Sequence, residues 1–153
     1  MDKSILSEYA DMKEEIKDLR RRISEDQKRI DQLKQTIVSD SVTCGKKGKK
    51  PIRTVKIKGF PQVEINRRVA LMERRQAKLQ MLETDLIEKQ QQVEEYIQTI
   101  QKSELRIMFR LYYIDSLTWY QVALKMNQMF AKRRVKYTED NCKQRHKRYL
   151  EKV

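Results

Sequence analysis

One stretch near the C-terminus carries side chains whose types and spacing suit hydrogen bonding to nucleic acid. As a helix, residues 138–151 would bury one side and turn another side outward. The inner side would consist of Cys142, His146, Tyr149 and Leu150. The outward side would carry Asn141, Lys143, Gln144, Lys147 and Arg148. Amide and amine groups hydrogen-bond the edges of bases and basic groups bind phosphates, so the pattern indicates contacts with a polyanion.

Residues that perform catalysis or hold metals are scarce in this chain. The sole histidine, His146, falls on the inner side of the predicted helix. The two cysteines, Cys44 and Cys142, lie far apart and have no metal-ligand spacing. No nucleophile motif and no paired carboxylates in an apolar setting accompany them. We therefore expect a protein that is not an enzyme, uses no cofactor or metal, and resides in a reducing compartment.

The helix at 138–151 needs neighbouring helices to hold it, and capping residues predict where they begin. Thr118 followed by Gln121 forms a capping box that starts one helix. Thr138 is the expected N-cap of the last helix, and two carboxylates follow in its first turn, where they favour the positive end. We therefore predict that residues 102–153 form a helix-turn-helix domain.

The apolar residues of these helices are spaced to form a small shared core. One side of the middle helix would present Trp119, Val122, Ala123 and Met126. The preceding helix would receive them with Leu105, Phe109 and Tyr112. We expect Trp119 to be a core residue rather than a platform on which a base stacks.

The charge of the chain is strongly positive and is concentrated in two places. Its 35 basic and 22 acidic residues give a net charge of +13. Residues 39–61 hold seven basic residues against one acidic residue, and residues 101–153 hold thirteen against five. Such an excess predicts attraction to nucleic acid or to an anionic membrane surface. No run of about 18 apolar residues is present, so no membrane-spanning segment is expected. The basic helix at 138–151 is suited to a major groove, so double-stranded DNA is the predicted partner.

The basic segment at 39–61 is a candidate arm. Its cations are Lys46, Lys47, Lys49, Lys50, Arg53, Lys56 and Lys58. It lacks the Lys-Ser/Thr pair of a phosphate-cradling nucleotide loop. The alternation of apolar and basic residues from Thr54 to Lys58 predicts a short strand or an extended arm. Two interpretations remain open: an arm on the DNA backbone that reaches the minor groove, or a solvated turn kept soluble by lysine.

The N-terminal residues 1–38 form a heptad array. Its seam runs through Ile5, Tyr9, Met12, Ile16, Leu19, Ile23, Asp26, Ile30, Leu33 and Ile37. Only Asp26 is polar in that seam. A period of 3.5 residues with isoleucine at a and leucine at d is typical of a two-stranded coiled coil.

A second long helix is predicted at residues 62–101, with a weaker apolar stripe. The stripe consists of Ile65, Val69, Met72, Leu79, Leu82, Leu86, Val93, Ile97 and Ile100. Arg75 and Lys89 interrupt it. Because both helices are about 55–60 Å long, we expect an all-α fold in which an antiparallel coiled-coil hairpin precedes the helix-turn-helix domain. Such a hairpin buries little by itself, so a homodimer through the coiled coil is expected.

Two motifs in the C-terminal domain resemble region 4 of the sigma-70 family of transcription initiation factors. Tyr113 to Ala123 looks like the junction of that family's first two helices, and Thr138 to Gln144 looks like the start of its recognition helix. The whole layout resembles phage and mobile-element late transcription regulators of the RinA and ArpU type. By that family pattern, Asp140, Lys143 and Gln144 face bases, with Glu139 and Asn141 close by.

The segment before the last helix departs from the family pattern. Residues 127–136 replace a turn of about four residues, so either the middle helix continues or a basic loop is inserted. Such cations position a protein on DNA without reading sequence. The expected phosphate contacts are Lys132, Arg133, Arg134, Lys136, Lys147 and Arg148.

Together these features predict a sequence-specific regulator of transcription that places helix 138–151 in the major groove. The resemblance implies the cytoplasm of a bacterial or phage-infected cell, with RNA polymerase as a further partner. Two alternatives remain: a DNA-packaging adaptor similar to a small terminase subunit, or an interaction protein that docks on RNA polymerase or another regulator.

Overall fold

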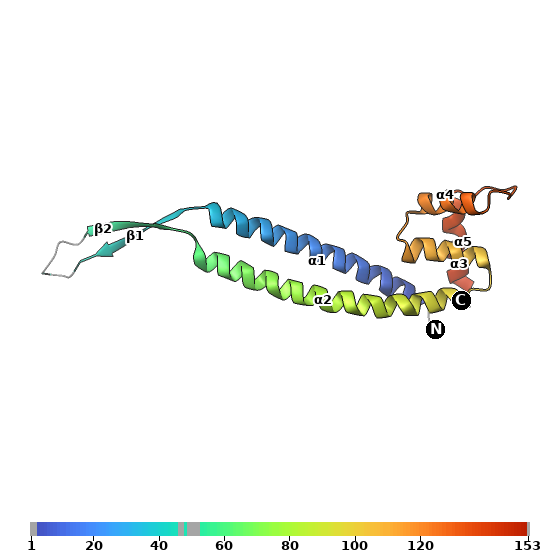
Figure 1. Cartoon of the computed structure of the whole chain (residues 1–153), viewed down its shortest axis with the longest axis horizontal. Helices are drawn as coiled ribbons and strands as arrows, with labels where there is room; N and C mark the ends of the chain where they lie inside the picture. Colours follow the sequence, from blue (N-terminus) through green and yellow to red (C-terminus); the bar gives the residue numbers. More distant parts are fainter. Residues whose placement is uncertain (1–2, 46–47, 49–52, 153) are drawn as a thin grey trace. The chain divides into compact units, whose positions relative to one another are not determined.

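Two long helices and three shorter ones make up most of the part of the chain that the structure describes (Figure 1). The computed structural model describes residues 3–45, 48 and 53–152. The first unit comprises Met1–Glu15 and Leu82–Val153, and the second unit comprises Ile16–Met81. Among the described residues, no helix is both long and apolar enough to cross a membrane.

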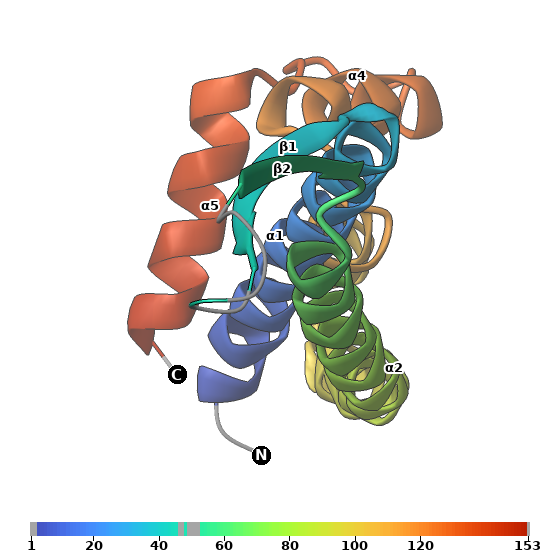
Figure 2. The ribbon, with the colours of Figure 1, turned by 90° about the vertical axis from the view of Figure 1, so that its left-hand side faces the viewer.

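The two long helices predicted from the sequence are confirmed. α1 (Ser4–Gln35) and α2 (Gln62–Thr99) run side by side in opposite directions (Figure 1, Figure 2). In the second unit they enclose a core of Ile30, Leu33 and Ile65, against which Val69 and Met72 pack. The apolar seams of both helices therefore face each other within one chain.

The polar interruptions of the two seams pair with each other. Asp26 is only 4% exposed, and its carboxylate forms an ion pair with Arg75. Arg68 lies 3.7 Å from the other oxygen of the same carboxylate. A buried carboxylate opposite two arginines is compensated at one register of the helices, so this cluster favours that register.

The predicted all-α class needs one correction, because the segment between the long helices forms a two-stranded sheet. β1 (Val38–Cys44) pairs antiparallel with β2 (Arg53–Gly59). The strand predicted at Thr54 to Lys58 is confirmed, whereas its partner β1 was not predicted. Ile37 was placed in the helical seam, but it lies outside α1 and is 65% exposed. The run of β-branched residues at 36–38 disfavours helix and favours extended backbone.

In the first unit, the ends of the long helices pack against the C-terminal helices. The core there contains Leu6, Tyr9, Val93, Tyr96, Ile97, Ile100, Phe109 and Tyr113. Leu6, rather than the predicted Ile5, is the more buried of the two at 1% exposure. Phe109 was expected to receive the middle helix, but it belongs to this core, while the adjacent Met108 faces the middle helix.

A chain reversal joins the first two short helices. α3 (Ser103–Phe109) widens into a π-turn, η1 (Arg110–Ile114), and Ser116 then takes a left-handed backbone with φ of 55°. Lys13 of α1 donates a hydrogen bond of 3.0 Å to the carbonyl of Tyr113 and another to the hydroxyl of Ser116. The first turns of α1 therefore satisfy the end of this helix.

The last two helices follow, and a second small core joins them. α4 (Trp119–Met129) begins at the predicted capping box of Thr118 and Gln121. α5 (Glu139–Lys152) begins after Thr138. The shared core contains Met108, Leu111, Val122, Ala123, Met126, Tyr137 and Cys142. The inserted segment combines the two alternatives: α4 continues to Met129, and a loop spans the residues up to Thr138.

Candidate nucleic-acid interface

The start of α5 is capped as predicted. The Thr138 hydroxyl accepts a hydrogen bond of 3.2 Å from the backbone N–H of Asn141. Glu139 and Asp140 occupy the first turn, where their charges interact favourably with the helix dipole. The cap sets the residue at which the helix begins and therefore which side chains face outward.

The inner side of α5 is anchored by packing. Cys142 is fully buried in the core shared with α4. The ring of His146 lies 4.8 Å from that of Phe109 and 5.0 Å from that of Trp119. Trp119 in turn stacks on Tyr112 at 4.0 Å. His146 is therefore packed as predicted, and Trp119 is partly buried and packs against the core shared by α4 and α5.

Burial favours the neutral forms of three titratable groups packed at this inner side, His146, Tyr113 and Cys142. Burial lowers the pKa of His146 to about 4. Burial also raises the pKa of the Tyr113 hydroxyl and of the Cys142 thiol above their usual ranges. The Tyr113 hydroxyl lies 2.9 Å from Nε2 of His146, so the two polar groups satisfy each other. These groups serve packing, since a buried protonated thiol is a poor nucleophile.

Three of the four predicted base-reading residues are accessible to solvent. Asp140, Lys143 and Gln144 are exposed on the outward side of α5. Asn141 is half-buried, and its side-chain oxygen accepts a hydrogen bond of 2.6 Å from Nε of Arg145. Asn141 therefore lies at the flank of the exposed group rather than at its centre.

Lys143 is paired within its own helix. Its ammonium lies 2.6 Å from the carboxylate of Glu139, and this hydrogen bond raises the pKa of Lys143. Both side chains are about half exposed, so the pair is solvated and easily exchanged for another partner.

The inserted loop is tied down at both ends. The side chain of Asn127 donates to the backbone carbonyl of Tyr137 at 2.8 Å and accepts from its N–H at 2.7 Å. Glu104 of α3 forms an ion pair with Arg133 and accepts a hydrogen bond of 2.7 Å from the Tyr137 hydroxyl. Arg145 of α5 reaches the same carboxylate at 3.3 Å. We call these four residues, Glu104, Arg133, Tyr137 and Arg145, the Glu104 cluster.

The predicted phosphate contacts fall into two groups. Lys132, Arg134 and Lys136 are exposed on the loop, although Lys136 also donates to the carbonyl of Ala131 at 3.0 Å. Arg133 differs because it is bound in the Glu104 cluster. On α5 the exposed cations are Lys147 and Arg148, and Lys147 lies 3.8 Å from Glu151.

A basic groove beside α5 was not predicted from the sequence. It encloses about 860 Å³, and its cations are Lys102, Arg133, Arg145, Arg148 and Lys152. Lys102 comes from the connection between α2 and α3, so only folding brings it to α5. The sequence contains one indication of this groove. Arg145, one turn after Asn141, is a cation on the predicted helix to which no role was assigned.

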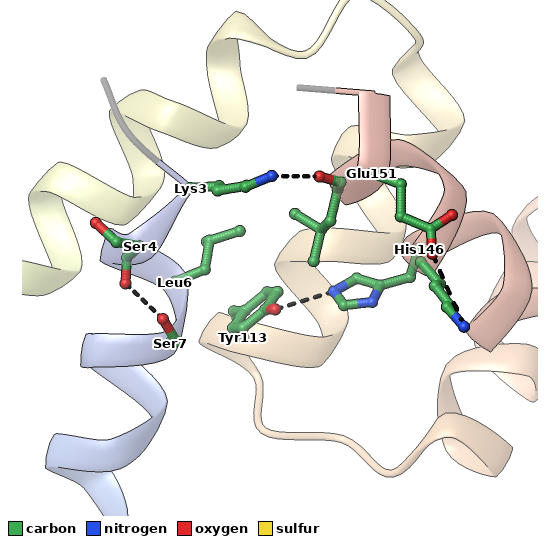
Figure 3. Close-up of a pocket in the computed structure, with 9 residues that line it drawn as sticks. Lys3, Ser4, Leu6, Ser7, Tyr113, His146 and Glu151 are labelled. Carbon is green, nitrogen blue, oxygen red and sulfur yellow. Dashed lines mark hydrogen bonds and ion pairs between the residues drawn. The ribbon is translucent and has the colours of Figure 1, made fainter.

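The first turns of α1 pack against the end of α5, around a cavity of about 700 Å³ (Figure 3). Figure 3 shows Leu6, Tyr113 and His146 directed toward this space. The ammonium of Lys3 donates a hydrogen bond of 2.9 Å to the carbonyl of Leu150, which satisfies one acceptor at the C-terminal end of α5. The N-terminal helix therefore also sets the position of α5.

The candidate arm is partly described. Arg53, Lys56 and Lys58 are exposed on β2. Four other predicted arm residues, Lys46, Lys47, Lys49 and Lys50, lie outside the described residues. Lys56 and Lys58 share one face of the sheet, opposite Ser41 and Ser39, whereas Arg53 is on the other face. The arm is therefore a two-stranded ribbon with its described cations divided between two faces.

The exposed side chains around α5 can form hydrogen bonds and can attract a polyanion. The described residues contain no group of three or more histidine, cysteine or carboxylate side chains that could hold a metal ion. Exposed hydrogen-bonding groups occupy the outward side of α5, and cations flank it on the loop and in the groove. No protein-family model, curated protein sequence or solved structure matches the chain.

Proposed function

We propose that the protein is a sequence-specific double-stranded DNA-binding regulator of transcription. One observation carries the proposal: α5 presents Asp140, Lys143 and Gln144 to solvent while its inner side is fixed by two cores. A recognition element must combine these properties, because base contacts need side chains held within a fraction of an ångström. In the resulting complex α5 lies in the major groove with its N-terminal half toward the bases.

The base contacts divide by chemistry. The amide of Gln144 pairs with the N6 and N7 edge of adenine, and the ammonium of Lys143 donates to guanine O6 and N7. The carboxylate of Asp140 accepts from the N4 amino group of cytosine. A target with these bases in neighbouring pairs is therefore expected.

The flanking cations account for positioning on the duplex. In the complex, Arg148, Lys152 and Lys102 of the basic groove beside α5 contact the phosphates of one DNA strand. The loop offers Lys132 and Arg134 to a second set of phosphates. Contacts of this kind fix orientation without reading sequence, so they provide affinity and leave specificity to α5.

The test is selection of bound sequences from random duplex DNA by the full chain at two salt concentrations. A recovered motif that persists at the higher salt supports the proposal. Lys143→Ala and Gln144→Ala should each cost about 1–3 kcal/mol on that motif and relax preference at one base pair. Lys28→Ala, which removes an exposed cation from α1, is the matched control and should leave the preference unchanged. Equal losses on the motif and on random DNA would exclude base reading by α5.

A further inference from the structure

The ribbon of β1 and β2 has unusually little cover for a sheet. All seven residues of each strand are exposed. An isolated two-stranded ribbon is marginally stable in water and needs more strands or a packed face for independent stability. We therefore expect another surface to pack against this ribbon.

The register of the strands divides the ribbon into two unlike faces. Residues that pair directly share a face, and successive residues alternate between faces. The hydroxyl face carries the pairs Ser39–Lys58, Ser41–Lys56 and Thr43–Thr54. The valine face carries the pairs Val38–Gly59, Asp40–Ile57, Val42–Val55 and Cys44–Arg53. The hydroxyl face is therefore suited to contact with water, whereas the valine face is not.

Exposed apolar side chains gather on the valine face. Val38, Val42, Val55 and Ile57 are between 39% and 54% exposed. Contiguous exposed apolar groups of this kind mark interaction sites in soluble proteins.

We propose that a second copy of this chain covers the valine face, so that two ribbons pack face to face about a two-fold axis. This proposal is independent of DNA binding. The coiled-coil seams of the second unit are occupied by the chain's own helices, since Ile30, Leu33 and Ile65 pack on one another. The valine face, in contrast, is an apolar surface of the second unit that is open to a partner.

The charges of the valine face are self-complementary. Its acidic residue, Asp40, and its basic residue, Arg53, belong to the pairs on either side of Val42–Val55. A two-fold axis that passes Val42 and Val55, perpendicular to the strands, places Asp40 of one copy near Arg53 of the other, twice. The valines then meet their own symmetry mates, as an isologous interface requires.

The charges also select the direction of packing. If the two ribbons pointed the same way, each pair would face its own equivalent, and Asp40 and Arg53 would stay about 14 Å apart along the strands. Two ribbons that point in opposite directions bring these charges together. Opposite directions are therefore part of the proposal.

The size of the face sets the expected affinity. Seven residues span about 24 Å and two strands about 10 Å, a footprint of about 240 Å². Standard stable interfaces use about 800 Å² per partner, so a weak dimer that forms only at high protein concentration is expected.

The experiment is sedimentation velocity of the full chain over a concentration series, with two charge reversals. Asp40→Lys and Arg53→Asp should each weaken dimerisation at least about tenfold, because like charges then face each other. An equal mixture of the two variants should recover dimerisation to near the wild-type level. In the mixed dimer the introduced lysine of one copy meets the introduced aspartate of the other, and the second pair keeps its original charges. Recovery in the mixture does not depend on DNA.

Two further variants complete the test. Val55→Lys should abolish dimerisation, and Lys56→Glu, a charge reversal on the hydroxyl face, should leave it unchanged. A wild-type chain that stays monomeric throughout the series overturns the proposal. So does a mixture that associates no better than either variant alone, which would point to pairing at the ribbon edges.

Discussion

At the scale of single residues, Glu104 shows how much of the candidate interface depends on one carboxylate. It holds Arg133 and Tyr137 of the inserted loop and Arg145 of α5. The exposed fraction of its side chain is 26%, so its hydrogen bonds are partly shielded from water. The loop, α3 and α5 are therefore joined by one group.

We expect Glu104→Gln to lower the free energy of unfolding by about 1.5–3 kcal/mol, because charge-assisted hydrogen bonds are lost and two arginines lose their counter-charge. Urea unfolding monitored by circular dichroism measures the change. Glu151→Gln breaks a solvated pair with Lys147 and should change stability by less than about 0.5 kcal/mol. Equal effects of the two substitutions would contradict a special role for the Glu104 cluster.

His146 makes stability depend on pH in one direction. Burial lowers its pKa to about 4, whereas in the unfolded chain it returns to about 6.5. The unfolded state therefore binds more protons between these values, so the free energy of unfolding falls as pH drops from about 7 to about 4. After allowance for partial exposure, the loss should be about 2 kcal/mol. His146→Gln should flatten this part of the curve, and an unchanged slope would show that other groups cause it.

At the scale of elements, the ion pair between α1 and α2 favours one register of the two helices. Asp26→Leu should destabilise the protein by about 3 kcal/mol, because Arg75 stays half-buried without its carboxylate. The double variant Asp26→Leu with Arg75→Leu should recover most of that loss, since an apolar pair fits the seam. A double-mutant cycle of urea unfolding measures the coupling. Additive losses would mean that the two residues do not act as a pair.

The elements differ in how far their sequences predicted them. Caps at Thr118 and Thr138 located α4 and α5 to within one residue, because a side chain that accepts from the backbone determines where a helix starts. The heptad period located α1 but not its end at Gln35. β1 was missed because Ser39, Asp40 and Ser41 are three consecutive polar residues, which interrupt the alternation of apolar and polar residues that marks a strand. In addition, β1 depends on pairing with a second strand further along the chain.

The site shows the same division. The exposed residues of α5 follow from helical periodicity and could be predicted from the sequence. The groove and the Glu104 cluster could not, because Lys102 and Glu104 meet α5 only through tertiary packing. The pairing of Asp26 with Arg75 was readable in principle, since each is a polar break in its own seam.

At the scale of the whole molecule, cations occur on two separate units, so the salt dependence of DNA binding reports which of them take part. If the hydroxyl face touches phosphates, Lys56→Ala with Lys58→Ala should reduce the slope of log affinity against log salt by about 2. Affinity for random duplex DNA, measured by fluorescence anisotropy at several salt concentrations, provides the slope. Arg29→Ala, which removes an exposed cation from α1, serves as the control. An unchanged slope would favour the interpretation of the segment as a solvated turn.

The division into two units also has a kinetic consequence. The second unit is one continuous segment, whereas the first unit joins Met1–Glu15 to residues from Leu82 onward. Contacts between distant residues form slowly, because a long loop must close before they stabilise the chain. We therefore expect the helical pair of the second unit to form early during synthesis. Leu6 and Tyr9 can be buried only later, after their packing partners in α2 and the C-terminal helices have been synthesised. The helix that presents the candidate DNA contacts is then placed only in the final steps of folding.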